Sequence, residues 1–320
     1  MKIVRIIEKK NLWFSISFLF IVIGFALMIA RAIQGKEVLN YGIDFSGGQT
    51  MILKFDELDK RLLNTHDKQV VNVKFIEEIR HILSNFNLEN SVIIITNDQQ
   101  VFIKMQTSDQ SNTQKINQKF QEAFGKFEIL EIDFIGPSIG EELRQKAALI
   151  FVVAMLAMTS YISWRFEWTY GLAAMLALLH DALITISFAS ISNIEINATF
   201  IAAILTILGY SINDTIVIFD RIRDNLKKLS STNSLEYISV LNQSITETFR
   251  RTINTSVTVL LVLLSLIIFG GQTLKEFCLV LFVGILAGTY SSIFTASPFL
   301  EVLNRFKKSN TPLNSKKISP

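Results

Sequence analysis

The sequence has little cysteine, little proline and few charged side chains. Its 320 residues include 1 Cys and 4 Pro, and Asp, Glu, Lys and Arg make up 18% of the chain, whereas a typical soluble domain has about 25%. The single cysteine, Cys278, excludes an intrachain disulfide, a CxxC redox pair and a zinc ribbon. Because 50% of the residues are hydrophobic, a disordered chain is also excluded. The scarcity of charge indicates a membrane protein.

The sequence also lacks the short motifs of nucleotide-binding and hydrolytic enzymes. It contains no P-loop, GxGxxG, HExxH or GxSxG motif, and no His and Cys residues at metal-ligand spacing. The net charge of +3 is too small to indicate nucleic-acid binding. We therefore expect no enzyme activity, no cofactor and no bound metal, and an energy source other than ATP hydrolysis by this chain.

Apolar stretches that could cross a membrane, which takes about 20 helical residues, are the main feature present. There are six: Leu12–Ala30, Ala147–Ser163, Thr169–Ile191, Ala198–Phe219, Ile253–Phe269 and Phe277–Leu300. No small-x-small cleavage site follows the first stretch, so we expect it to be an uncleaved anchor. The second and fifth stretches are short for a span, and we expect them to extend into flanking residues.

The distribution of Lys and Arg predicts the orientation of these spans. An even number of spans places both termini on one side, and the segments on that side contain 16 Lys and Arg. On the other side, the short loops and the flanks of the large loop contain 5. Since Lys and Arg are enriched on the cytoplasmic side, residues 1–30 should form a cytoplasmic N-terminus and the first span. Residues 147–300 should hold the other five spans, with a cytoplasmic loop at 221–252 and a cytoplasmic tail at 301–320.

Residues 31–146 have the size of a domain and lie between the first two spans, on the extracytoplasmic side. They carry 14 Lys and Arg and 17 Asp and Glu. Helical spacing is present at 70–86 and 113–124, and strand patterns are present at 50–55, 91–96, 101–105 and 127–134, with a turn signal at Asn97-Asp98. The order β-α-β-β-α-β is ferredoxin-like. We expect an α-helical integral membrane protein, a six-span bundle with an α+β ferredoxin-like domain between spans 1 and 2.

Polar side chains inside the spans are the first candidates for function, because an ionisable group costs about 2.5–3.5 kcal/mol at the bilayer centre. The third span contains His180-Asp181, the fourth contains Asn213-Asp214, and the fifth begins with Arg250-Arg251 and includes Thr255. Asp214 precedes Asp220 by six residues, which places it about 9 Å deeper in the membrane. A purely structural role is least expected for Asp214.

Simpler explanations stay open for the other polar residues. Arg250 and Arg251 could be snorkelling anchors, and His180-Asp181 could relay protons or only support packing. We expect Asp220 and Arg221 to form an interfacial ion pair or a helix cap. Gly284 and Gly288 form a GxxxG motif, which predicts close helix packing.

Glycine-containing motifs lie on both sides of the domain, at the water boundary. YGIDFSGGQT leads into the domain and includes Gly42, Asp44, Phe45, Gly47 and Gly48. IGPSIGEEL leads out of it and includes Gly136, Pro137, Gly140 and Glu142. Gly47-Gly48 allows a turn with positive φ, and Pro137 with Gly140 is expected to set a bend.

These motifs, in this order, resemble the SecF family of the bacterial Sec protein-export machinery. The resemblance extends from about Trp13 to Leu300 and also includes LLHDALIT, GYSINDTIVIFDRIRDNL, RRTINTS and SSIFTASPFL. It implies a subunit of the bacterial inner membrane that forms a transporter of the resistance-nodulation-division type with SecD. It also implies work with the SecYEG channel, the SecA ATPase and YajC, and use of the proton motive force to pull translocating preproteins outward.

The resemblance further implies that Asp214 and Arg251 couple proton movement to export, as the Asp of the SIND motif and the Arg of the RT motif. Thr252 follows Arg251, which favours Arg251 over Arg250. We expect protonation of Asp214 from the outer side to weaken its pairing with Arg251, shift the bundle and tilt the domain. The supporting polar residues would be His180, Asp181, Asn213 and Thr255.

Other functions fit parts of the sequence. A half-size proton-coupled exporter of small molecules, from the same superfamily, would have to homo-oligomerise. An intramembrane aspartyl protease needs two apposed aspartates and a GxGD motif, which GYSIND lacks. A structural scaffold of the translocon would need neither Asp214 nor Arg251.

Overall fold

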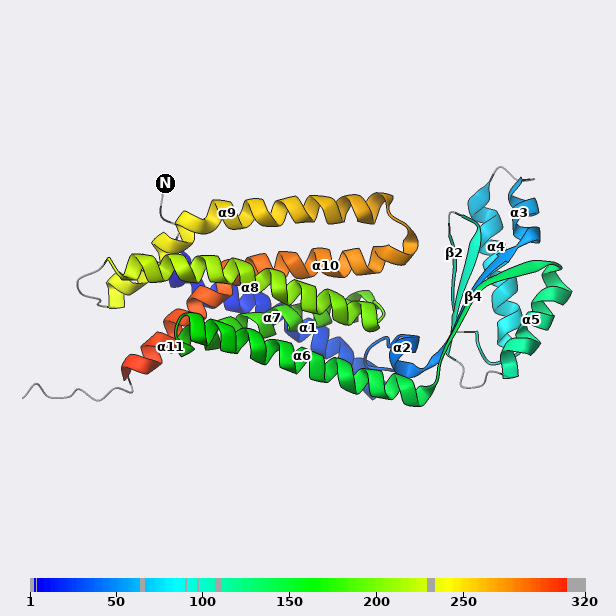
Figure 1. The fold of residues 1–320 in the computed structure, drawn as a ribbon, viewed down its shortest axis with the longest axis horizontal. Helices are drawn as coiled ribbons and strands as arrows, with labels where there is room; N and C mark the ends of the chain where they lie inside the picture. Colours follow the sequence, from blue (N-terminus) through cyan, green and yellow to red (C-terminus); the bar gives the residue numbers. More distant parts are fainter. Residues whose placement is uncertain are drawn as a thin grey trace, which may run out of the picture.

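The computed structural model describes residues 3, 5–63, 67–89, 91–96, 98–106, 111–228 and 234–309. A bundle of long helices and a smaller α+β domain lie at opposite ends of an elongated molecule (Figure 1). Asn97 of the predicted turn, 229–233 of the predicted loop and 310–320 of the predicted tail lie outside the described residues.

The predicted bundle is confirmed, because six helices within the described residues are long and apolar enough to cross a membrane. The long helices are α1 (Lys10–Ile33, after the short η1, Ile7–Lys9), α6 (Pro137–Arg165), α7 (Trp168–Ser192), α8 (Ala198–Leu226), α9 (Ser234–Phe269) and α10 (Gln272–Ser291). A π-helical turn, η2 (Ser292–Ala296), joins α10 to α11 (Ser297–Ser309). The helices α6 and α9 are far longer than their apolar stretches, because helical hydrogen bonding continues into the polar flanks.

Three of these helices form the centre of the bundle. The helices α7, α8 and α10 are about half buried along their apolar windows, whereas α1, α6 and α9 are mostly exposed. The predicted GxxxG packing is confirmed: a Cβ atom added to Gly284 would lie 2.1 Å from Ile207 Cδ1, and one added to Gly288 would lie 2.9 Å from Ser211 Cβ. The helices α8 and α10 therefore touch along a row of small residues.

The α+β domain (residues 48–135) contains an antiparallel sheet with the strand order β2-β3-β1-β4. Its elements are β1 (Gly48–Phe55), α3 (Asp56–Leu63), α4 (Lys68–Ser84), β2 (Val92–Ile95), β3 (Gln100–Met105), α5 (Ser111–Phe124) and β4 (Phe127–Ile135). This is the predicted ferredoxin-like arrangement. Only α3 was not predicted, because its eight residues are too few to show a helical period.

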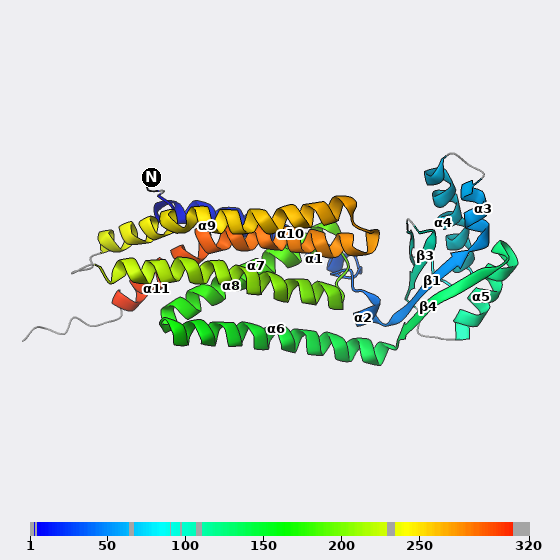
Figure 2. The same cartoon turned by 45° about the horizontal axis from the view of Figure 1, so that its top comes forward.

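The core of the domain lies between the sheet and its helices, which cover the face turned away from the bundle (Figures 1 and 2). Phe55, Phe75 and Phe120 are fully buried at its centre. The ring of Phe55 meets Phe75 edge-on at 5.3 Å and Phe120 at 5.8 Å between centroids. The opposite face of the sheet is left turned toward the bundle.

Candidate functional site

Asp214 lies in α8, where this helix packs against α9 and α10. Its exposed fraction is 3%. Its Oδ2 atom has no hydrogen-bond partner within the described residues. The Ser256 hydroxyl on α9 lies beside it, but donates to the Thr252 carbonyl at 3.0 Å and lies 2.6 Å from Thr289 Oγ1. Arg251 is close enough to Asp214 to interact electrostatically. The carboxyl group is therefore enclosed but incompletely paired.

The expected direct pairing of Asp214 with Arg251 is not formed in the described part of the chain, where no ion pair joins the two side chains. Arg251 precedes Ser256 by five residues on α9, which is about 7.5 Å along the helix axis. Its side chain is exposed and lines a cavity of about 290 Å³ between α8 and α9. The two groups are near neighbours rather than a closed pair.

His180 and Asp181 belong to a second, fully buried group of polar residues. The Asp181 Oδ1 atom lies 3.0 Å from His180 Nδ1, and its Oδ2 atom accepts hydrogen bonds from Ser211 Oγ at 2.5 Å and Ser291 Oγ at 2.8 Å. Asp181 thus ties α7 to α8 and α10. Ser292 Oγ, in turn, lies 3.0 Å from Thr215 Oγ1.

This network approaches Asp214 but does not join it. Ser211 and Thr215 flank Asp214 on α8, yet no hydrogen bond from either side chain reaches the Asp214 carboxylate among the described residues. This geometry supports a packing role for His180-Asp181, which holds α7 against α8 and α10 and is called the anchoring role below, over a role in relaying protons. Sequence reasoning missed Ser211 and Ser291, although hydroxyl residues within apolar spans were the signal that could have found them.

The remaining predicted polar residues lie apart from Asp214. Asn213 is exposed on the outward face of α8. Thr255 Oγ1 donates to the Arg251 carbonyl of its own helix at 2.9 Å. The described residues contain no group of three His, Cys, Asp or Glu side chains that could hold a metal ion.

The expected pairing of Asp220 with Arg221 is wrong. Asp220 accepts from Arg223 at 3.1 Å, whereas Arg221 Nε donates to Glu247 Oε2 on α9 at 2.5 Å. Neighbouring residues of a helix point about 100° apart and do not face each other, whereas residues three apart do. Arg221 therefore links α8 to α9.

The two glycine motifs, predicted separately, form one joint between the domain and the bundle. A Cβ atom on Gly47 would lie 2.9 Å from the Pro137 backbone, and one on Gly140 would lie 3.0 Å from Gly47 N. Gly47 also has a φ of 77°, which favours glycine. Gly136 and Pro137 begin α6, and Phe45 is buried beneath the contact. Backbone thus meets backbone where the chain enters and leaves the domain.

The same joint is attached to the start of α8. Asp44 Oδ2 accepts from Ala198 N at 2.9 Å, and Asn197 Oδ1 accepts from Phe200 N at 2.9 Å, so both side chains cap this helix. Gly42 N donates to Ile196 O at 2.9 Å, and Gly48, with a φ of 152°, starts β1. Glu142 lies outside this contact and forms a surface ion pair with Lys146 at 2.6 Å.

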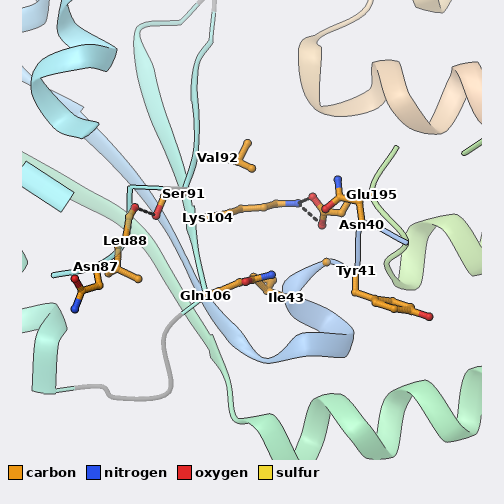
Figure 3. A pocket seen from close by; sticks show the side chains of 11 residues that line it. Asn40, Tyr41, Ile43, Asn87, Leu88, Ser91, Val92, Lys104, Gln106 and Glu195 are labelled. Carbon is orange, nitrogen blue, oxygen red and sulfur yellow. Dashed lines mark hydrogen bonds and ion pairs between the residues drawn. The ribbon is translucent and has the colours of Figure 1, made fainter. Parts of the chain in front are cut away.

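A polar cavity of about 280 Å³ lies beside the joint, between the sheet and the loop that connects α7 to α8 (Figure 3). Lys104 of β3 reaches across it, and its Nζ atom lies 2.9 Å and 3.0 Å from the two carboxylate oxygens of Glu195 (Figure 3). This ion pair connects the sheet directly to the loop that precedes α8.

Comparisons with known proteins agree with this architecture. Residues 115–305 match the family model described as protein export membrane protein SecD/SecF, C-terminal, and residues 38–57 match the SecD/SecF GG motif. The protein translocase subunit SecF of Sebaldella termitidis is 36% identical over 305 residues, covering 95% of this chain and 93% of the relative. SecF of Rickettsia akari is 38% identical over 280 residues, 86% of each chain.

Solved structures of SecDF resemble this chain over almost its whole length. The crystal structure of SecDF, a translocon-associated membrane protein from Thermus thermophilus, matches with a TM-score of 0.75 and 31% identity, covering 96% of this chain and 39% of that chain. SecDF in a super-membrane-facing form matches with a TM-score of 0.66 and 30% identity, covering 97% and 40%. The chain spans about two fifths of the SecDF chains.

Proposed function

The chain belongs to the SecF family of protein translocase subunits, and from this we propose that it works with SecD to assist preprotein export driven by the proton motive force. It is a multi-pass membrane protein. In this proposal it lies in the bacterial inner membrane, with both termini and residues 221–252 in the cytoplasm and residues 31–146 outside. It acts as an accessory subunit beside SecYEG, SecA and YajC rather than as an enzyme, and protons are the coupling ions.

The observation that carries the proposal is Asp214, a buried carboxyl group with one unpartnered oxygen. A charged Asp214 attracts Arg251 and a protonated one does not, so the two protonation states favour different positions of α8 and α9. One charge that moves through 100 mV is worth about 2.3 kcal/mol. That free energy is enough to bias a bundle with two arrangements.

A partner bundle is supported by the outward faces of α8 and α9. The residues Ala202, Thr206, Gly209 and Asn213 on α8, and Arg251, Asn254 and Thr258 on α9, are exposed. Small and polar side chains at a membrane helix surface are typical of contacts with other helices and not with lipid. We therefore place SecD against this face.

The joint supplies the path from α8 to the domain. Asp44 caps the first turn of α8, and the ion pair of Glu195 with Lys104 lies just before that helix. A displacement of α8 on protonation of Asp214 would therefore reach β3 and the domain through direct contacts. In the proposal this is how the bundle tilts the domain that handles the preprotein.

The test is Asp214→Asn in the SecDF complex, reconstituted with SecYEG and SecA in vesicles. We expect transport driven by ATP alone to persist and the stimulation by an imposed proton gradient to disappear, a loss of up to about fiftyfold if one proton's 2.3 kcal/mol is coupled. Asp220→Asn, on the same helix, is the control and should keep the stimulation. Normal stimulation with Asp214→Asn would refute the proposal.

Native mass separates the proposal from the half-size exporter. We expect this chain to be purified from its native membrane in a complex with SecD. A homo-oligomer that lacks SecD and transports small molecules would support the exporter instead.

A further inference from the structure

The cavity of about 290 Å³ between α8 and α9 lies at the end of the bundle far from the α+β domain, C-terminal to Asp214 along α8. It is lined by three carboxylates and two arginines: Asp220, Asp224, Glu247, Arg221 and Arg251, together with Val217 and Thr248. Any of these carboxylates could attract the Arg251 guanidinium once Asp214 is protonated and neutral.

The carboxylates on α8 already have cations from α6 or from their own helix. Asp220 lies 3.1 Å from Arg223 and 3.8 Å from Arg165, and Asp224 lies 3.8 Å from Lys227. Asp220 and Asp224 therefore pair with residues of α6 and α8, and no ion pair joins either of them to α9 among the described residues.

Glu247 is held in a different way, from both helices of the cavity. Its Oε2 atom accepts from Arg221 Nε at 2.5 Å and from Asn225 Nδ2 at 2.9 Å, and its Oε1 atom accepts from Gln243 Nε2 at 2.9 Å. The ion pair is half-exposed, with 31% of the Glu247 side chain accessible. Its partners hold the carboxylate at the wall that Arg251 also lines.

The spacing along α9 places Arg251 between two carboxylates. Glu247 precedes it by four residues, so the two side chains share one face, about 6 Å apart along the axis. Ser256, the neighbour of Asp214, follows it by five residues on the other side. Arg251 itself forms no ion pair in the described part of the chain.

We propose that Glu247 is the alternate partner of Arg251, the carboxylate to which the guanidinium turns when Asp214 is protonated. Arg221 then competes with Arg251 for Glu247, so the link between α8 and α9 loosens at the moment when Asp214 becomes neutral. Glu247 is a positioning residue for the coupling reaction. This inference rests on the proposed function and adds a residue to it.

The charged groups around Glu247 determine which cation this carboxylate pairs with. On α8 these are Asp220, Arg221 and Asp224, and on α9 Arg251. Glu8 of η1 accepts from Asn242 Nδ2 at 3.0 Å on a different face of α9 and does not line this cavity. Mutations at Arg221 or Glu247 can therefore change how the two arginines, Arg221 and Arg251, compete for the Glu247 carboxylate.

The experiment measures gradient-stimulated export by the reconstituted SecDF complex as the pH of the outer side is varied. In Glu247→Gln, Arg251 loses its alternate partner and interacts with Asp214 alone, which stabilises the charged form of the Asp214 carboxyl group. The half-maximal pH should therefore fall by about 1 unit. In Arg221→Gln, Glu247 is released for Arg251, so the half-maximal pH should rise. Glu247→Asp keeps the charge and should give a smaller downward shift than Glu247→Gln.

A structural role would give a different result. If Glu247 only ties α9 to Arg221, both variants break the same contact, and shifts in the same direction, or no shifts, would overturn the inference. Arg221→Gln alone still decides the question if Glu247→Gln fails to assemble with SecD. Asp214→Asn in the same assay distinguishes the two failures: if its stimulation is lost while the other variants shift together, only the role of Glu247 is refuted.

Discussion

The α+β domain and the spanning bundle both bury apolar side chains, but only the bundle also buries a network of polar side chains around a carboxylate among the described residues. In the domain, Phe55, Phe75 and Phe120 form the centre, and the charged residues lie at the surface. In the bundle, Asp181 is fully buried among hydroxyl groups, whereas Phe18 on α1 is 67% exposed. Water favours the burial of apolar surface, whereas lipid does not, so membrane helices associate through close packing and hydrogen bonds.

The largest expected effect comes from breaking the apolar core of the domain. Leu58→Ala removes a fully buried side chain of α3 and should destabilise the domain by about 2–5 kcal/mol. Leu63→Ala, on the same helix at 85% exposure, is the matched control, with an expected change below about 0.5 kcal/mol. Hydrogen exchange of domain peptides in the full complex measures the difference. Equal protection in both variants would contradict an apolar core.

A smaller effect is expected from breaking the polar centre of the bundle. In the native protein the two carboxylate oxygens of Asp181 contact His180, Ser211 and Ser291. Asp181→Asn leaves one acceptor oxygen, so at least one of these contacts is lost. Membrane hydrogen bonds are worth about 0.6–1.7 kcal/mol each, and we expect a loss of about 1–2 kcal/mol. Asp224→Asn, half-exposed on α8, should change little. Unfolding in mixed micelles provides the measurement, and a stable Asp181→Asn bundle would refute the anchoring role.

The smallest effect is expected where the two regions meet. A double-mutant cycle of Lys104→Gln and Glu195→Gln should give a coupling of about 1 kcal/mol or less, reduced further by salt. The exposed Lys119–Glu122 pair within α5 is the reference and should couple more weakly. Hydrogen exchange in β3 and in the loop between α7 and α8 reports the coupling. A coupling no greater than the reference would show that this ion pair does not join the domain to the bundle.

Local patterns were enough for much of the fold. The strand predicted at 50–55 is β1, Gly48–Phe55, and the helix predicted at 113–124 is α5, Ser111–Phe124. Alternation and helical spacing predict such elements because they reflect which face of one segment is buried. The missed helix α3 and the extended α6 show the limits, since short elements and polar flanks carry no such pattern.

The candidate site was predictable only in part. A carboxylate within an apolar stretch identified Asp214, because the cost of burying charge is visible in one segment. Arg251 was assigned only through the resemblance to the SecF family. Their neighbours were not visible: Ser256 beside Asp214, and Glu247 bound to Arg221. Nothing in one helix's sequence states which side chain of another helix will face it.

The sequence by itself determined the six spans, the order of the α+β domain and the few charges that the membrane must accommodate, since hydropathy and periodicity are properties of single segments. The tertiary structure decided which of those charges meet. It placed Ser211 and Ser291 on Asp181 across 30 and 110 residues of chain, and it joined two glycine motifs into one contact. Such contacts depend on the rotation and depth of whole helices, which are set by packing between segments.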